Sequence, residues 1–390
     1  MEYIPYSTQS ISDEDVAAVT AALTSPFLTQ GPGVVAFEDA FAARHQVAHA
    51  IAVSNATAAL HIGCLALDVG PGSLVWTSPN SFLASANCAL YCGAEVDFVD
   101  IDPQSRNMSV AALAAKLAAA EAAGRLPDVV IPVDFSGLSA DIADIRTLAD
   151  RYGFKILEDA SHAAGASYRG APVGSAFADA TVFSFHAVKI VTTGEGGIVT
   201  TNDPALARRL QLLRSHGMTR EADEMGGNPD GPWYYEQTTL GFNYRLTDVQ
   251  AALGLSQLGR MDAMQAERVR RADRYDALLS DLPLKLPMRA NDRVSSWHLY
   301  AIEIDPGQTA VTRGQLFDAL KAASIGVNVH YIPIHTQPHY QRLGFKPGDF
   351  PAAEAYYAQA ISIPLFPAMT DAQQDRVVAV IRQTLAGGAA

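Results

Sequence analysis

Residues 154–166 read FKILEDASHAAGA, and this stretch carries the strongest indication of the fold. Its apolar residues are typical of a buried strand that ends in Glu158-Asp159 and is followed by small residues. In open α/β sheets the carboxyl ends of parallel strands face the ligand crevice. The stretch therefore predicts an acidic side chain at a binding site, although an Asp here can equally cap a following helix.

Short apolar runs alternate with Ala-rich helical runs on both sides of this stretch. We expect strands at 49–53, 73–76, 94–99, 128–132 and 154–158, helices at 56–67, 82–91, 110–122 and 141–152, and a β-rich stretch at 180–200. This alternation predicts a mostly parallel sheet with helices on both faces.

The alternation fades after about residue 202. The polar stretch 219–237 is long for a loop, and we expect it to border the active site and to order when substrate binds. The elements expected beyond it are a helical stretch at 247–280, a strand at 298–304, a helix at 313–323, a short strand at 327–331 and a helix at 371–385. We therefore predict an α/β fold, with a large mostly parallel-sheet domain at 1–255 and a smaller α+β domain at 256–390.

Composition excludes several classes of protein. Hydrophobic residues make up 49% of the 390 residues and charged residues 18%, which excludes a disordered chain. The net charge of −13 argues against a nucleic-acid binder, which neutralises phosphates with excess Lys and Arg. No apolar run approaches the roughly 20 residues of a membrane helix, and the N-terminal sequence lacks the features of a signal peptide. Three cysteines without a CxxC pair suit a reducing compartment, so we expect a cytoplasmic protein.

Lys189 is the candidate nucleophile. It lies in TVFSFHAVKIVTTGEGGIVTT, residues 181–201, among aromatic and branched apolar residues. A lysine in such surroundings loses solvation, so the pKa of its amine falls toward neutrality. A neutral amine is a nucleophile that forms Schiff bases. A solvated edge lysine is the common alternative, but Ser184, Asp159 and a GEGG turn accompany this one.

A third stretch, VSNATAALHIGCLAL at 53–67, predicts an anion site. A strand runs into a helix whose start carries Ser54, Asn55 and Thr57. Free amides at a helix start attract phosphate, although an ordinary helix cap gives the same pattern.

The three stretches together match one cofactor. A phosphate cradle, an Asp for a pyridinium nitrogen and a Schiff-base lysine are the groups that pyridoxal 5′-phosphate (PLP) requires. In this interpretation Thr57 and Ser184 bind the phosphate with the helix-start amides. Phe82 stacks on the ring of the cofactor.

The motifs resemble those of the DegT/StrS sugar-nucleotide aminotransferases, a group within fold type I of the PLP enzymes. The resemblance covers nearly the whole chain. It runs from LTQGP (28–32) through SNATAAL, EDASHA, FSFHAVK, TTGEGG and RSHGM to GFNYRLTDVQAALGLSQL (241–258). It implies PLP as cofactor, a large three-layer domain with a smaller C-terminal domain, and a homodimer with shared active sites.

The resemblance also implies a role for each matching residue. Lys189 matches the Schiff-base lysine, and Asp159 matches the partner of the pyridine nitrogen. His162 stands where the group usually has Gln, near the phenolic oxygen of the cofactor. The implied phosphate contacts are Ala56, Thr57, Ser184 and, from the neighbouring subunit, Asn243. The implied nucleotide-sugar contacts are Tyr6, Phe27, Leu28, Thr29, Gln30, His330 and Tyr331.

The implied reaction is a transamination in two halves, with Lys189 moving protons as general acid and base. L-Glutamate is the implied amino donor, and the C4 ketone of a nucleotide-linked sugar is the acceptor. PYS (5–7), SFLASAN, RSHGM and VHYIPIH (329–335) most resemble members that act on a UDP-linked 4-keto-6-deoxy-N-acetylhexosamine in the pseudaminic acid pathway. A GDP- or dTDP-linked sugar, or one of opposite C4 stereochemistry, is the alternative. Arg245 and Arg214 can bind carboxylate or pyrophosphate, or can instead form ordinary ion pairs.

Two other readings are weaker. His335 and His339 are spaced like zinc ligands on a helix, but Pro338 between them disfavours a helix, and we expect no metal. A non-catalytic protein of the same fold would be expected to lack the Schiff-base lysine, and Lys189 is present.

Overall fold

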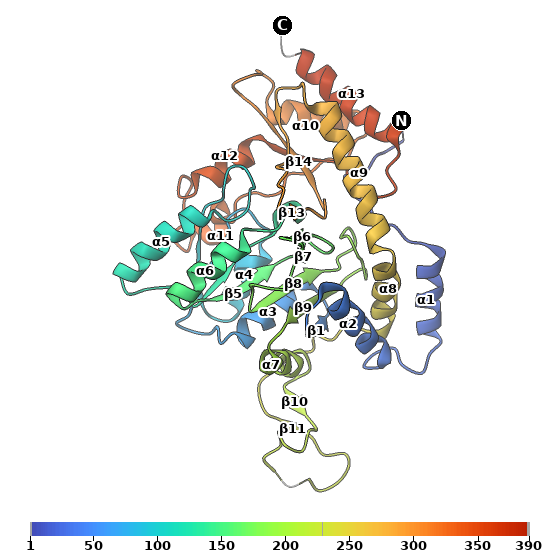
Figure 1. Ribbon diagram of the computed structural model, residues 1–390, viewed down its shortest axis with the longest axis vertical. Coiled ribbons are helices and arrows are strands. Elements are labelled where there is room, and N and C mark those ends of the chain that lie inside the picture. Colours follow the sequence, from blue (N-terminus) through green and yellow to red (C-terminus); the bar gives the residue numbers. More distant parts are fainter. Residues whose placement is uncertain (1, 228, 388–390) are drawn as a thin grey trace.

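A seven-stranded sheet lies at the centre of the computed structural model, which describes residues 2–227 and 229–387 (Figure 1). Its strand order is β1-β9-β8-β5-β4-β2-β3. The strands are β1 (His49–Val53), β2 (Leu74–Thr77), β3 (Glu95–Phe98), β4 (Val129–Ile131), β5 (Lys155–Asp159), β8 (Ala180–Ser184) and β9 (Gly197–Thr201). β9 runs antiparallel to both of its neighbours, and the other neighbouring pairs are parallel. The predicted mostly parallel sheet is confirmed.

Helices cover both faces of this sheet. One face carries α3 (Ala56–Ala66), α4 (Ala84–Tyr91) and α7 (Pro204–Arg214), and the other carries α2 (Pro32–His45), α5 (Val110–Ala122), α6 (Ile142–Tyr152) and α8 (Asp248–Gly259). Successive strand residues point to opposite faces. Ile51 and Val53 therefore pack with the first group of helices, whereas Ala50 and Ala52 pack with the second. The predicted three layers follow from this alternation.

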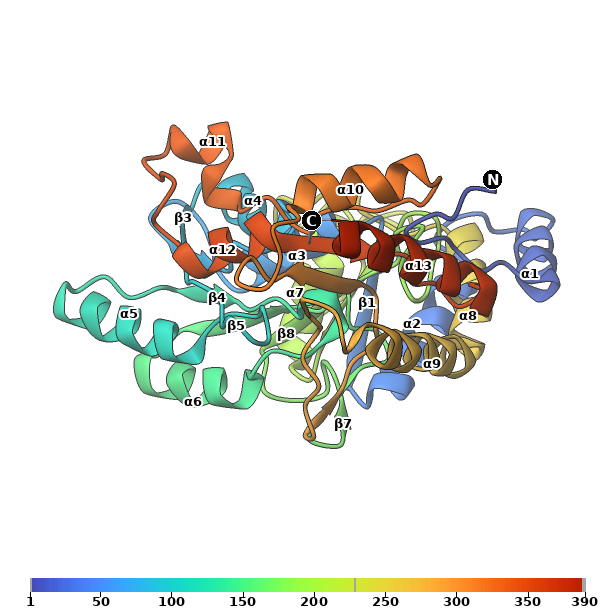
Figure 2. The same cartoon turned by 90° about the horizontal axis from the view of Figure 1, so that it is seen from above.

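The C-terminal region has a hydrophobic cluster of its own. It forms between the sheet β12-β14-β15 and the helices that pack on it. Its elements are α9 (Met261–Leu279), β12 (Leu284–Lys285), β14 (Tyr300–Ile304), α10 (Arg313–Ala322), β15 (Ala360–Ile363) and α13 (Asp371–Gly387). Ile4 joins this cluster, and Figure 2 shows α10 and α13 side by side over the rest of the chain. The division at 255/256 stays a prediction.

The remaining elements are short or peripheral. They are α1 (Asp13–Leu23), the 3-10 turns η1 (Phe135–Gly137) and η2 (Ile334–Thr336), α11 (Pro338–Gln341), α12 (Pro351–Gln359), the sheet of β6 (Ser167–Tyr168), β7 (Ala171–Pro172) and β13 (Arg293–Val294), and the pair of β10 (Met218–Thr219) and β11 (Glu236–Gln237). The β10–β11 arm extends away from the body beyond α7 (Figure 1). No described helix is long and apolar enough to cross a bilayer.

Two of the expected elements are wrong. The stretch 247–280 is two helices, because α8 ends at Gly259, a poor helix former, and α9 begins at Met261. No strand forms at 327–331, where Asn328 makes only an isolated bridge to Ser362. There the backbone turns toward Asn80, whose side-chain oxygen accepts from the Tyr331 amide at 3.3 Å. The helices α1, α2, α7, α11 and α12 were not expected, because they lie outside the βα alternation. The expectation that Pro338 disfavours a helix is wrong, because Pro338 takes the first position of α11, where a proline is tolerated.

Arg268 on α9 connects this helix by hydrogen bonds to the segment at 297–298 and to Leu365. Its buried guanidinium donates to the carbonyls of Trp297, His298 and Leu365 at 3.1, 3.3 and 3.2 Å. Burial lowers its pKa to about 10, so the side chain remains charged at neutral pH. One buried cation therefore fixes the position of three backbone carbonyls.

We expect Arg268→Met to lower the free energy of unfolding by about 2–4 kcal/mol, because three carbonyls lose a charged donor. Arg270→Met is the matched control, because Arg270 lies on the same helix in half-exposed ion pairs with Glu267 and Asp371. Its expected cost is below about 1 kcal/mol. Urea denaturation measures both variants, and equal losses would contradict the role of Arg268.

Candidate active site

A cavity of about 830 Å³ opens at the carboxyl ends of β5 and β8. Its walls also include the start of α3, the turn before α4 and the segment 328–331. The predicted site residues that line it are Tyr6, Ala56, Thr57, Phe82, Asp159, His162, Ser184, Lys189, His330 and Tyr331. Residues far apart in the sequence are thus brought to one cavity, as the motifs predict.

The pairing of β5 with β8 places two of these residues at the same edge. Asp159 is in register with Val182, and the Ala160 amide donates to the Val182 carbonyl at 2.8 Å. Because the strands are parallel, Ser184 at the end of β8 lies at the same edge as Asp159. Residues 160–166 form turns, so Asp159 does not cap a helix.

Lys189 lies in the turn that follows β8, where its amide donates to the His186 carbonyl at 2.9 Å. Burial in the cavity lowers the pKa of its amine to about 8, and the Asp159 carboxylate opposes this shift. At this pKa about a tenth of the amine is unprotonated at pH 7, and about half at pH 8. This is the form that attacks a carbonyl carbon.

Asp159 is hydrogen-bonded at both of its oxygens. The Ser85 hydroxyl donates to Oδ2 at 2.6 Å, and the Ser161 amide donates to Oδ1 at 3.1 Å. Glu158 and Asp134 are buried next to it, and burial raises the pKa of both their carboxyls, that of Glu158 to about 7. Asp159 is thus a fixed carboxylate beside two carboxyls that resist ionisation.

The start of α3 combines an ordinary helix cap with backbone amides suited to an anion. Asn55 caps the helix, because its side-chain oxygen accepts from the Ala58 amide at 2.8 Å. The amides of Ala56 and Thr57 precede the first intrahelical donor and lie at the cavity. Gly197 on β9 packs so closely that a Cβ there would lie 2.7 Å from the Ala56 nitrogen. Only glycine fits at this position, and the amides stay accessible to an anion.

His162 is a neutral imidazole with an assignable tautomer. The Ser136 backbone amide approaches Nδ1 at 3.3 Å, and an amide can only donate, so Nδ1 accepts. Burial, with Lys189 and His330 nearby, holds the pKa of His162 well below 6.5. Nε2 therefore carries the hydrogen and donates to the Tyr331 hydroxyl at 3.1 Å. The hydroxyl hydrogen of Tyr331 is left for another acceptor.

Two further histidines, His298 and His330, line the cavity as neutral imidazoles. His298 was not singled out from the sequence, because it stands at the start of an apolar strand. Its ring centroid lies 4.4 Å from that of His162, and its Nδ1 has no hydrogen-bond partner among the described residues. Burial and nearby Lys189 hold its pKa well below 6.5 and lower that of His330 to about 3. Ser81 and Glu195 also line the cavity without having been predicted.

Six predicted residues lie outside the cavity of their own chain: Phe27, Leu28, Thr29, Gln30, Asn243 and Arg245. They come close to one another through an antiparallel bridge between Thr29 and Thr247 and a hydrogen bond of 3.0 Å from the Asp248 amide to the Leu28 carbonyl. Arg245 bridges Val53, just ahead of the cavity residue Asn55. Their predicted roles stay predictions. The described residues of the 219–237 arm do not line this cavity either.

The other candidates make internal contacts. Arg214 pairs with Glu38 and donates to the Ala52 carbonyl at 2.8 Å, so the ion-pair alternative holds for it. His335 pairs with Glu354 at 2.9 Å. The described part of the chain contains no group of three or more His, Cys, Asp or Glu side chains that could hold a metal ion.

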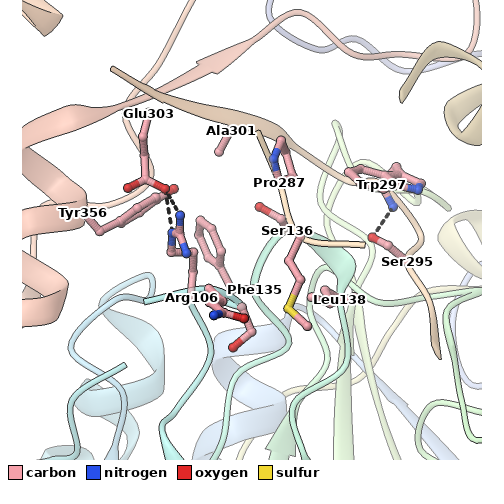
Figure 3. Close-up of a pocket in the computed structure, with 13 residues that line it drawn as sticks. Arg106, Phe135, Ser136, Leu138, Pro287, Ser295, Trp297, Ala301, Glu303 and Tyr356 are labelled. Carbon is pink, nitrogen blue, oxygen red and sulfur yellow. Dashed lines mark hydrogen bonds and ion pairs between the residues drawn. The ribbon is translucent and has the colours of Figure 1, made fainter. Parts of the chain in front are cut away.

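A second pocket lies between β14 and the turn at 135–138 (Figure 3). Its volume is about 30 Å³, room for one or two waters. Arg106 forms an ion pair with Glu303 inside it, and the Trp297 amide donates to the Ser295 hydroxyl at 3.0 Å. This pocket is a small gap between packed elements and is too small for a substrate.

We expect the Lys189 amine of the cofactor-free protein to titrate near pH 8, because burial disfavours its ammonium form. Pulse acylation over a series of pH values, with peptide mass mapping, measures the labelling midpoint. Exposed Lys346 is the control for the change in reagent reactivity with pH. A Lys189 midpoint at the ordinary lysine value near 10.4 would contradict the burial argument.

We expect stability to fall between about pH 4.5 and pH 7, because folded Glu158 keeps a proton that the unfolded chain has lost. The raised pKa corresponds to roughly 3 kcal/mol over this window. Glu158→Gln mimics the protonated side chain and should flatten the slope, whereas Glu121→Gln on exposed α5 should leave it unchanged. Urea denaturation at several pH values tests this. Identical slopes for wild type and Glu158→Gln would rule out a proton held by Glu158.

Comparisons with known proteins agree with this site. The family model described as the DegT/DnrJ/EryC1/StrS aminotransferase family matches residues 9–382. The spore coat polysaccharide biosynthesis protein SpsC of Bacillus subtilis is 40% identical over 388 residues, covering 99% of this chain and 98% of that protein.

Solved structures show the same fold. Helicobacter pylori PseC, an aminotransferase involved in the biosynthesis of pseudoaminic acid, is 30% identical, with a TM-score of 0.89 over 99% of this chain and 100% of that chain. The PLP form of the putative sugar aminotransferase Spr1654 from Streptococcus pneumoniae is 27% identical, with a TM-score of 0.87 over 99% of both chains. The expected fold class and the expected cofactor are both confirmed. With a buried lysine and a fixed carboxylate at one cavity, the chain belongs to the DegT/DnrJ/EryC1/StrS aminotransferase family and is a PLP-dependent sugar aminotransferase.

Proposed function

We propose that this enzyme transfers the amino group of L-glutamate to the C4 ketone of a UDP-linked 4-keto-6-deoxy-N-acetylhexosamine. The product is UDP-4-amino-4,6-dideoxy-N-acetyl-β-L-altrosamine, an intermediate of the pseudaminic acid pathway. The observation that carries amino transfer is the buried Lys189 amine in one cavity with the fixed Asp159 carboxylate. The likeness to Helicobacter pylori PseC over the whole chain supports the choice of sugar.

The residues of the cavity fit PLP. The cofactor supplies an electron-accepting ring that stabilises negative charge at the carbon that loses a proton. We assign Asp159 to the protonated pyridine nitrogen, and Ala56, Thr57 and Ser184 to the phosphate. Phe82, whose side chain is more than half exposed, offers its ring face for stacking. His162 lies near the phenolic oxygen in this assignment.

Lys189 has two tasks in the proposed reaction. Its neutral amine holds the cofactor before the amino donor arrives. Once displaced, the amine takes a proton from one carbon and returns one to another in each half-reaction. A pKa of about 8 suits both tasks, because the amine exchanges protons readily near neutral pH. Neighbouring His298 and His330 stay neutral and leave this role to Lys189.

The anionic substrates need cations that this cavity lacks. Its described lining contains Lys189 and four histidines but no arginine. Carboxylates and pyrophosphates are commonly bound by bidentate arginine. We therefore propose a homodimer in which Asn243, Arg245 and residues 27–30 of a second copy complete each site. About half of each Phe27 and Leu28 side chain is exposed, as expected of residues that a partner covers.

Mixing two inactive variants tests this arrangement. In the proposed arrangement each site takes Lys189 from one subunit and Arg245 from the other. A hybrid of Lys189→Ala with Arg245→Ala therefore has both substitutions in one site and neither in the second site. Random exchange of subunits should restore about a quarter of wild-type activity. If Arg245 served its own chain's site, both sites of the hybrid would be disabled and the mixture would stay inactive. Mixing Lys189→Ala with Asp159→Ala, two residues of one cavity, is the control that should stay inactive.

The choice of sugar is tested with a panel of UDP-, GDP- and dTDP-linked 4-keto sugars, with PLP and L-glutamate. We expect kcat/KM for the UDP-linked N-acetyl sugar to exceed the others at least about tenfold, a discrimination of roughly 1.4 kcal/mol. Lys189→Ala should lose at least about a thousandfold in kcat while its melting temperature is retained. A preference for a GDP- or dTDP-linked sugar would replace the proposed substrate by the alternative.

The cytoplasmic location stays a prediction.

A further inference from the structure

Two serines at the start of α4 extend the hydrogen bonding of Asp159. The Ser85 Oγ lies 2.6 Å from Asp159 Oδ2, and the Ser81 Oγ lies 2.7 Å from the Ser85 Oγ. Ser85 has no exposed surface, and Ser81 exposes only 3% of its surface, in the lining of the cavity. A chain of hydroxyls therefore runs from the cavity wall to the carboxylate.

The direction of this chain is fixed by its end. An ionised carboxylate only accepts, so Ser85 spends its single hydrogen on Asp159. The Ser81 hydroxyl must then be the donor in the second bond, and the Ser85 oxygen accepts from it at 2.7 Å. Ser81 lies in the bend before α4 and Ser85 in the first turn of the helix, and the chain between them brings the two side chains together. The sequence segment SFLASAN at 81–87 thus has a structural purpose beyond helix formation.

Asp159 needs such a donor because of the charges around it. The titratable groups that act on it are Glu158, its neighbour on β5, with Asp134 after β4, Lys189 after β8 and Tyr331. His162 is buried nearby and neutral. A buried carboxylate in such surroundings keeps one orientation only where donors hold its oxygens.

We propose that Ser85 is a positioning residue that fixes the orientation of the Asp159 carboxylate for the pyridine nitrogen of PLP. Ser81 supports it by donating to its oxygen. The inference rests on the proposed assignment of Asp159 to that nitrogen. Ser85 does not itself line the cavity, so it acts through Asp159 and not on the substrate.

The affinity for PLP tests this role without requiring turnover. Titration of the cofactor-free protein with PLP, followed by absorbance, gives a dissociation constant for wild type and each variant. We expect Ser85→Ala to weaken PLP binding about ten- to a hundredfold, because a buried carboxylate loses a donor.

Three further variants separate positioning from packing. Ser85→Thr keeps the hydroxyl and should bind PLP within about threefold of wild type, and Ser81→Ala should fall between wild type and Ser85→Ala. Cys88→Ala is the matched control, because Cys88 is equally buried one turn along α4 and its thiol donates to the Ser85 carbonyl and not to Asp159. A Ser85→Ala affinity equal to that of Cys88→Ala, or a Ser85→Thr affinity as weak as that of Ser85→Ala, would overturn the inference and leave the proposed function intact. A wild-type protein that takes up no PLP would overturn the proposed function, and the inference with it.

Discussion

The parallel pairing of β5 with β8 is the constraint on which the rest of this site depends. It sets Asp159 and Ser184 at one edge of the sheet and directs the turn that carries Lys189 over that edge. A slip of the register by one residue would move the Asp159 side chain to the other face of β5. The alternating burial on both faces of the sheet makes such a slip costly, because every strand would then expose its apolar residues to the wrong layer.

Burial then sets the chemistry of the cavity. The same loss of solvation lowers the pKa of the Lys189 amine, raises that of the Glu158 carboxyl and keeps the histidines neutral. Asp159 differs from its neighbours because it accepts hydrogen bonds at both oxygens. One cavity thus holds a nucleophilic amine and a fixed carboxylate beside neutral histidines. That combination is what PLP chemistry requires of a protein.

The central sheet and the two key residues could be predicted because their patterns are local. Apolar runs ending in an acidic pair, and a lysine among aromatic residues, are visible in one pass along the chain. Helix α2 and the break between α8 and α9 were missed, because they depend on packing against the sheet and on a single glycine. The contact between Ser85 and Asp159 joins residues 74 positions apart, and no local sequence pattern predicts it. The resemblance to a family supplied most of the substrate-site residues, and residues 27–30 show that such residues need not reach the cavity of their own chain.

The central claim is that Lys189 is the lysine that binds PLP. Borohydride reduction of the purified protein with bound PLP, followed by peptide mass mapping, tests it most directly. The account predicts a visible absorption band that disappears on reduction and a pyridoxyl group on the peptide that contains Lys189. A protein that shows no such band after addition of PLP, or that carries the pyridoxyl group on another lysine, would contradict it.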